Sequence, residues 1–178
     1  MPITMTSSRS RRCGLTVGLC LVTILSGCST PLRQEHMTIA PNPPGGRFAV
    51  ALARAMCVRN VSGAEGQLTD SDFRDALVSS LEAIGLKAAP ESCKYPVDVN
   101  ILGIARPTFA RDMTVTTHIN YKVYDYSGSA VLLETVSAPF TATTSDASYG
   151  AHRSRLAHEG SVRESISRFL DKLRGVSL

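Results

Sequence analysis

The chain has 178 residues, of which 43% are hydrophobic, and carries a formal net charge of +4. Three of its 19 basic residues, Arg9, Arg11 and Arg12, stand near the N-terminus, ahead of a charge-free segment. Without this N-terminal part the chain is nearly neutral, which gives no general electrostatic argument for binding nucleic acid. The remaining length of about 150 residues suits one domain with its own hydrophobic core.

The N-terminal segment predicts export. Residues 13–25 contain no charged side chain and follow the three arginines, which is the arrangement of a secretory signal peptide. A helix of that length spans about 20 Å, whereas the hydrocarbon core of a membrane is about 30 Å thick. The segment is therefore too short for a permanent transmembrane helix, and we expect residues 1–27 to be removed as a signal peptide.

The residues that end this segment predict a lipid anchor. Leu25, Ser26 and Gly27 directly precede Cys28, and this order resembles the lipobox of bacterial lipoproteins, in which the cysteine thiol is diacylated. The alternative is a plain signal peptide followed by an incidental cysteine. Two or three acyl chains on Cys28 would hold the protein to a membrane almost permanently. By the same resemblance, Ser29 in place of aspartate indicates the outer membrane and its periplasmic face.

Two cysteines remain for the folded part of the chain. Cys13 and Cys20 leave with the signal peptide, so Cys57 and Cys93 are the candidates for one disulfide in an oxidising periplasm. The alternative is two separate buried thiols, because a bridge needs Cα atoms within about 7 Å. Neither cysteine belongs to a Cys-x-x-Cys or Cys/His cluster, so we expect no metal site and no cofactor besides the covalent lipid.

Residues 28–47 have the composition of a tether. This stretch is rich in proline and glycine, which disfavour a helix and favour an extended chain that holds a domain away from the membrane. A short strand over residues 36–40 would interrupt it. We expect residues 48–178 to form a single periplasmic domain.

The hydrophobic pattern of this domain predicts two helices and several strands. Apolar residues recur every three or four positions over residues 70–84 and 151–174, and alternate with polar residues over 95–101 and 113–123. Further strands are expected within residues 48–61 and over 130–138, where Pro139 either bends the strand or ends it before residues 140–144. The predicted fold is α+β, a two-layer sandwich in the order βαβββα. An antiparallel-rich sheet of about four strands carries both helices on one face.

No catalytic or metal-binding set is evident. His118, His152 and His158, with Asp146 and Glu159, could be combined on paper into a metal or acid–base site. His152 and His158 are six positions apart, however, which places them on different faces of a helix. A Gly-x-Ser-x-Gly nucleophile elbow is missing, and the glycines are of the turn type rather than of a phosphate-binding loop. We therefore interpret the histidines as surface residues.

The polar stretch over residues 141–150 is the candidate binding loop. Thr141, Thr143, Asp146 and Tyr149 supply hydroxyl, carboxylate and aromatic groups within a few positions. Loops carry function more often than their share of the chain, so this one is either a binding edge or a plain connection.

Several stretches resemble one family of small proteobacterial outer-membrane lipoproteins of unestablished function. They are residues 112–116, Tyr121, Asp125, Gly128, residues 138–143, 145–147 and 153–161. Members of that family often carry the name UDP-N-acetylglucosamine acyltransferase. The acyltransferases themselves are left-handed β-helices of hexapeptide repeats, and this sequence has no six-residue repeat. In element order alone, the chain is also similar to the lipopolysaccharide-assembly lipoprotein and to auxiliary lipoproteins of lipid transporters.

Together these features predict a non-catalytic binding or scaffold module, anchored in the outer membrane and accessory to an envelope assembly or lipid-transport complex. Its expected partners are the membrane, through Cys28, and an envelope protein, with no nucleic acid. The alternative is an enzyme that acts on envelope glycans or lipids.

Overall fold

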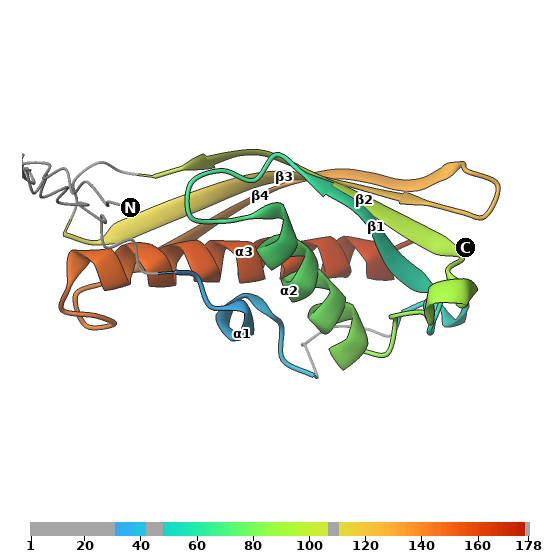
Figure 1. The fold of residues 1–178 in the computed structure, drawn as a ribbon, viewed down its shortest axis with the longest axis horizontal. Helices are drawn as coiled ribbons and strands as arrows, with labels where there is room; N and C mark the ends of the chain where they lie inside the picture. Colours follow the sequence, from blue (N-terminus) through green and yellow to red (C-terminus); the bar gives the residue numbers. More distant parts are fainter. Residues whose placement is uncertain (1–30, 42–47, 107–110, 177–178) are drawn as a thin grey trace, which may run out of the picture.

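The computed structural model describes residues 31–41, 48–106 and 111–176 (Figure 1). The predicted signal peptide and Cys28 lie outside the described residues. Three α-helices and four strands make up the described fold, together with two short 3-10 helices, Val50–Leu52 and Pro90–Ser92. Their bounds are α1 Gln34–Met37, β1 Met56–Ser62, α2 Asp70–Ala83, β2 Tyr95–Ala105, β3 Met113–Tyr124, β4 Ala130–Ala142 and α3 Gly150–Arg174.

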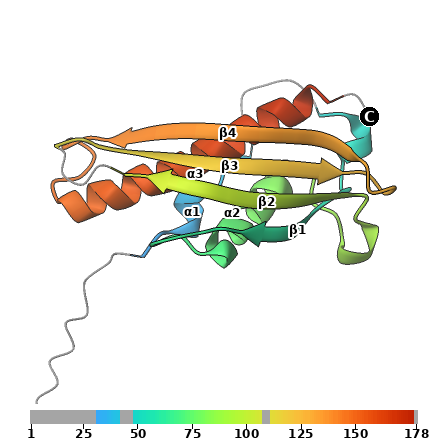
Figure 2. The ribbon, with the colours of Figure 1, turned by 90° about the horizontal axis from the view of Figure 1, so that it is seen from above.

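The strands form one sheet in the order β1-β2-β3-β4, and the helices lie on one side of it (Figures 1 and 2). β1 and β2 are parallel, because α2 connects them as a crossover, whereas β2, β3 and β4 are antiparallel neighbours. α2 packs against β1, and α3 runs along β3 and β4. The predicted α+β architecture is confirmed, with a sheet that is mixed rather than wholly antiparallel.

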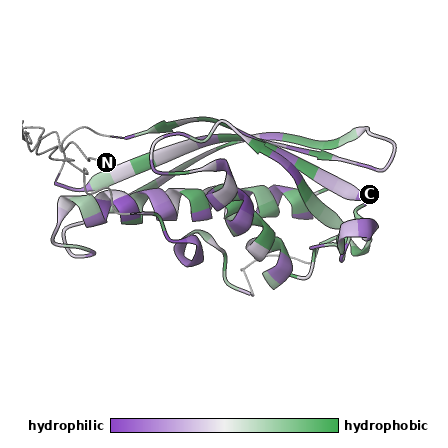
Figure 3. Ribbon diagram, in the orientation of Figure 1, coloured by the Kyte–Doolittle hydropathy of each residue, from purple (hydrophilic) through white to green (hydrophobic). Residues whose placement is uncertain are grey.

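α2 begins where the sequence predicts, because Thr69 caps it. The Asp72 backbone N–H donates to the Thr69 hydroxyl at 3.1 Å, and the Thr69 N–H donates to the Asp72 carboxylate at 3.2 Å, which forms a capping box. Phe73, Leu77 and Leu81 are the large apolar side chains of its buried face. Hydrophobic and hydrophilic residues also alternate along α3 (Figure 3).

Small residues let α3 lie close to the sheet. Gly160 faces the ring of Phe140, and the Ser161 and Ser165 hydroxyls bond to groups of β3. At the centre of the core the rings of Tyr121 and Phe169 stack with centroids 4.3 Å apart. Burial raises the pKa of the Tyr121 hydroxyl above its usual range.

Three elements differ from expectation. Pro139 does not end β4, which continues to Ala142; β4 is an edge strand, where proline is tolerated. Residues 48–55 form no strand, and β1 starts at Met56. The strand expected over residues 36–40 is wrong, since α1 ends at Met37 and residues 38–40 have no regular secondary structure.

Residues 31–41, which were expected in the tether, pack against the domain. α1 contacts α2 and α3, the side chain of Met37 is fully buried, and Ile39 is 8% exposed. The physical reason is that these two apolar side chains complete the core between the helices. We call residues 31–41 the strap.

Candidate functional site

The predicted binding loop starts with a turn that is held by hydrogen bonds between its own residues. The backbone N–H and the hydroxyl of Thr143 donate to the Asp146 carboxylate at 2.7 and 2.9 Å. These hydrogen bonds lower the pKa of Asp146. Thr143 and Asp146 thus repeat the arrangement of Thr69 and Asp72 at the start of α2. The carboxylate of Asp146 serves the conformation of its own loop.

The four candidate loop residues do not converge on one point. Thr141 lies on the face of the sheet that no described helix covers, where its hydroxyl is 2.8 Å from that of Thr114. Tyr149 is 74% exposed at the start of α3, and its ring meets His152 edge-on with centroids 6.0 Å apart. Asp146 lies on the helical side, where it lines a groove.

This groove lies between the strap, α3 and the end of β4. Its volume is about 280 Å³, and Phe140, Ala142 and Leu156 form its apolar part. His36, Glu159 and Arg163 join Asp146 as its titratable lining. The groove is open to solvent, and it brings together residues that are more than a hundred positions apart in the sequence.

Glu159 is the organising residue of the groove. Its side chain is 1% exposed, and its carboxylate accepts from the Arg33 backbone N–H at 2.7 Å and meets Nδ1 of His36 at 2.8 Å. Nε of Arg155, one turn earlier on α3, lies 3.5 Å from the same carboxylate. Both oxygens therefore have partners, and the bonds to Arg33 and His36 hold the strap on α3.

A second bond reinforces this attachment. The Arg163 guanidinium donates to the carbonyl of His36 at 2.9 Å and lies 5.6 Å from the centroid of the Phe140 ring. On the other side of the strap, the Ile39 N–H donates to the Ser80 hydroxyl at 3.3 Å. This cluster was not expected from the sequence, in which its one signal is a glutamate on the apolar side of a helix.

The three histidines that could have formed a metal site lie apart. His118 points to the uncovered face of the sheet, opposite Ser137 of β4. His152 is exposed at the start of α3, whereas His158 is 1% exposed and is not the surface residue we expected. Burial, with a smaller contribution from the positive charge of Arg106, lowers the pKa of His158 to about 4. Within the described residues, no group of three or more His, Cys, Asp or Glu could hold a metal ion.

The uncovered face of the sheet carries a row of polar side chains. Ser62, Asn100, Asn120 and Thr135 are successive partners across the four strands, and Asn120 donates its amide N–H to the Thr135 hydroxyl at 2.9 Å. A shallow depression of about 250 Å³ lies along this face over β1, β2 and β3. Amides and hydroxyls of this kind both donate and accept, so the face suits a polar partner.

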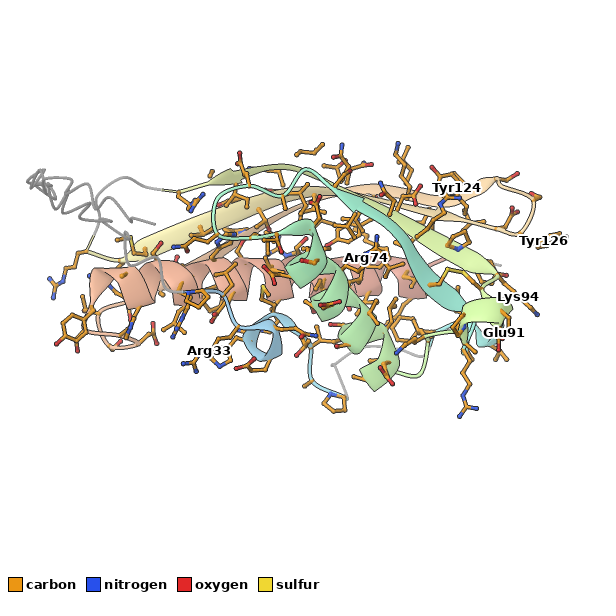
Figure 4. The ribbon with its side chains drawn as sticks, in the orientation of Figure 1. Arg33, Arg74, Glu91, Lys94, Tyr124 and Tyr126 are labelled. Atoms are coloured by element: carbon orange, nitrogen blue, oxygen red, sulfur yellow. A yellow bond between two sulfur atoms is a disulfide. The ribbon has the colours of Figure 1, made fainter. Side chains whose placement is uncertain are left out.

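An ion pair and an aromatic ring border the depression. Nε of Arg59 donates to the Asp98 carboxylate at 2.9 Å, and this hydrogen bond lowers the pKa of Asp98. The same guanidinium lies 4.8 Å from the centroid of the Tyr124 ring. Figure 4 shows Tyr124 on the sheet side of the molecule and Arg33, in the strap, on the helical side.

Cys57 and Cys93 form a disulfide in the structure. Their Cα atoms are 5.6 Å apart, and the bridge joins β1 to the turn before β2. The loop it closes contains α2. Among the helices that the structure describes, none is long and apolar enough to cross a membrane.

No protein-family model matches the sequence, and the search of curated proteins found no match. Solved structures do resemble it. The protein XCC0632 from Xanthomonas campestris, of family DUF330, aligns with a TM-score of 0.55 and 12% identity over 77% of this chain and 91% of that one. The domain shares its fold with XCC0632.

Two further structures are similar at lower scores. A candidate lipoprotein from Caulobacter crescentus CB15 has a TM-score of 0.48 and 20% identity over 66% of this chain and 88% of its own. A minor lipoprotein from Acinetobacter baumannii has a TM-score of 0.48 and 8% identity, with coverages of 69% and 94%. At such identities the likeness to solved structures concerns the fold alone, and the role of the protein is argued from its own residues.

Proposed function

We propose that this protein is a lipoprotein of the bacterial outer membrane. In this proposal it is anchored through Cys28, faces the periplasm, and acts by binding an envelope protein rather than by catalysis. The observation that carries the anchor is the order Leu25, Ser26, Gly27, Cys28 at the end of a short apolar segment. The likeness to XCC0632 supports only the fold and adds no role.

The bonding of the groove beside Glu159 supports a role without catalysis. A general acid or base needs a group that is free to exchange a proton with a substrate. Glu159 instead accepts from the strap through both oxygens, and Asp146 accepts from Thr143 within its own loop. An enzyme on envelope glycans or lipids that used Glu159 or Asp146 as its acid or base would need to break these bonds first. In the described residues there is also no left-handed β-helix, the fold of the acyltransferases.

The uncovered face of the sheet is the binding surface in this proposal. Its polar row crosses all four strands of the described sheet, and no described element packs over it. Asn100 and Asn120 stand at the centre of that row. A surface of amides and hydroxyls suits a hydrogen-bonded protein interface with modest apolar content.

Metabolic labelling with a palmitate analogue tests the anchor. We expect the exported protein to incorporate the label and Cys28→Ala to lose it. Cys13→Ala and Cys20→Ala are the matched controls, because both lie in the segment that is removed, and they should keep the label. Absence of label, or label that persists in Cys28→Ala, would contradict the proposal.

Photo-crosslinking in cells tests the binding surface. A crosslinking amino acid at position 120 should yield a product of defined mass with an envelope protein. The same amino acid at Asp75, which is exposed on α2 on the other side of the molecule, should yield none. Equal products at both positions, or a product at position 75 alone, would assign the partner to another surface.

A further inference from the structure

The strap limits how the domain can stand on a membrane. We infer that α1, α2 and the N-terminal half of α3 face the phospholipid bilayer, so that the uncovered face of the sheet points into the periplasm. This inference rests on the proposed lipid anchor at Cys28. It implies a short tether in place of the long one expected from the sequence. The helical side then contacts the surface of a phospholipid bilayer.

The first step concerns where the chain is first fixed to the domain. The Arg33 N–H is bonded to Glu159, and the side chain of His36 meets the other oxygen of the same carboxylate. Met37 is buried without exposure. The strap is thus attached to α3 from Arg33 onward, and it is held by contacts with residues more than 120 positions away.

The second step is a comparison of lengths. Arg33 stands five positions after Cys28, and an extended chain of five residues reaches at most about 18 Å. If residues 31–47 were all free, Phe48 would be the first fixed residue, and twenty residues would reach about 70 Å. The attachment of the strap therefore shortens the reach of the anchor roughly fourfold.

The third step compares this reach with the size of the domain. The domain has two layers, of which the sheet is about 10 Å thick and a helix about 10 Å across, so its thickness is roughly 20 Å. α1 lies on the helical side, away from the uncovered face of the sheet (Figure 1). If that uncovered face lay on the bilayer, Arg33 would stand roughly 20 Å above the lipid, which a fully extended tether of about 18 Å would not quite reach. The tether length thus disfavours contact between the uncovered face and the bilayer and favours the helical side, which carries the strap.

The helical side carries charges of both signs. Arg33 is exposed in the strap, and Arg155 and Arg163 lie beside it on α3. Glu159 and Asp146 already accept hydrogen bonds from the protein, whereas Glu35 in the strap and Asp75 on α2 are exposed. The helical side thus presents the exposed guanidinium of Arg33, a group that phosphate headgroups bind well, among exposed carboxylates.

Energy transfer from single tryptophans to dansyl-labelled lipid tests the orientation, since the chain contains no natural tryptophan. Asp75→Trp places the donor on the outer face of α2, and Lys122→Trp places it on the uncovered face of β3. Both residues are exposed in the structure. We expect higher transfer from position 75 than from position 122.

The attachment is made chemically, so that the test does not depend on acylation in cells. With Cys57 and Cys93 in the disulfide, Cys28 is the one free thiol of residues 28–178, and it couples to vesicles that contain maleimide lipid. Every described core residue lies within residues 32–176, so this processed chain keeps the whole described core. A failure of palmitate labelling would then overturn the anchor, whereas this measurement addresses the orientation alone.

A longer tether is the decisive variant. Insertion of about twenty Gly and Ser residues after Thr30 leaves the strap and the domain unchanged but adds a flexible chain with a mean reach of roughly 25 Å. We expect the difference between the two donor positions to be lost. Equal transfer in the unaltered chain, or a difference that persists with the insertion, would overturn the inference.

Discussion

A Cβ atom on Gly160 would lie 2.3 Å from Cδ1 of Phe140, well inside the contact distance of two carbon atoms. Gly160→Ala therefore has two opposing effects. Alanine favours a helix over glycine by about 1 kcal/mol, but overpacking a closed contact costs about 1 to 3 kcal/mol. We expect the clash to dominate and the free energy of unfolding to fall, as measured by urea denaturation.

Gly103→Ala is the matched control, because a Cβ at Gly103 would have no heavy atom within 4 Å. Its free energy of unfolding should change by no more than about 0.5 kcal/mol. Phe140→Leu should partly rescue Gly160→Ala by removing the ring. A Gly160→Ala protein as stable as the unaltered one would show that α3 can move away from β4 at little cost.

Ser161 joins α3 to the sheet through a buried hydroxyl. It accepts from the Thr117 N–H at 2.9 Å and donates to the carbonyl of Ala138 at 2.7 Å. Ser161→Ala would leave two buried backbone groups without this partner, so we expect a loss of about 1 to 3 kcal/mol in the free energy of unfolding. Ser167→Ala on the same helix is the control and should have little effect. Equal stabilities of both variants would argue against a structural role of the hydroxyl.

The elements that the sequence predicted well are those fixed by local rules. α2 is marked by the cap residue Thr69 and by apolar residues at helical spacing, and β3 by strict alternation over its whole length. Both signals are contained within about a dozen neighbouring residues. The uncovered polar face was foreseeable along β3, but its alignment with Asn100 depends on the bulge of β2 between Ile101 and Gly103.

The strap could not be predicted in the same way. Its proline-rich surroundings favour an extended tether, and only contacts with Glu159 and Ser80 reveal that it packs on the domain. Such contacts join residues far apart in the sequence, and no local pattern specifies them. For the same reason the buried position of His158, on a helix with charged neighbours, did not follow from periodicity.

The strap predicts a protease-sensitive variant. Glu159→Gln keeps the size of the side chain but removes the charge that His36 and the Arg33 N–H bind. Breaking a buried charged contact costs several kcal/mol, so the strap should detach more often. We expect trypsin to cleave after Arg33 faster than in the unaltered protein. Glu164→Gln, which alters an exposed pair with Arg168, is the control and should be cleaved at the original rate.

The disulfide predicts a stability that depends on redox conditions. Cys57 and Cys93 are 36 positions apart, and closing a loop of that length destabilises the unfolded chain by roughly 3 to 4 kcal/mol on the loop-entropy model. A reductant should lower the free energy of unfolding by that order, as measured by urea denaturation. The double variant Cys57→Ser, Cys93→Ser should be insensitive to the reductant. Equal stability of the oxidised and reduced protein would contradict a stabilising bridge.

His158 predicts a loss of stability in acid. Its pKa is about 4 in the folded protein because the side chain is buried, and about 6.5 in an unfolded chain. The unfolded state therefore binds more protons between these two values, so stability is complete above pH 6.5 and falls as the pH drops toward 4. The expected loss from this one residue is up to about 3 kcal/mol.

Urea denaturation at several pH values, with His158→Leu for comparison, isolates this contribution. Carboxylates titrate in both proteins and cancel in the difference, so the unaltered protein should lose stability relative to the variant only below pH 6.5. His152→Leu removes an exposed histidine and should keep the original pH profile. Parallel profiles of the unaltered protein and His158→Leu would contradict this prediction. They would mean that the charged imidazole of His158 is solvated or paired in the folded protein.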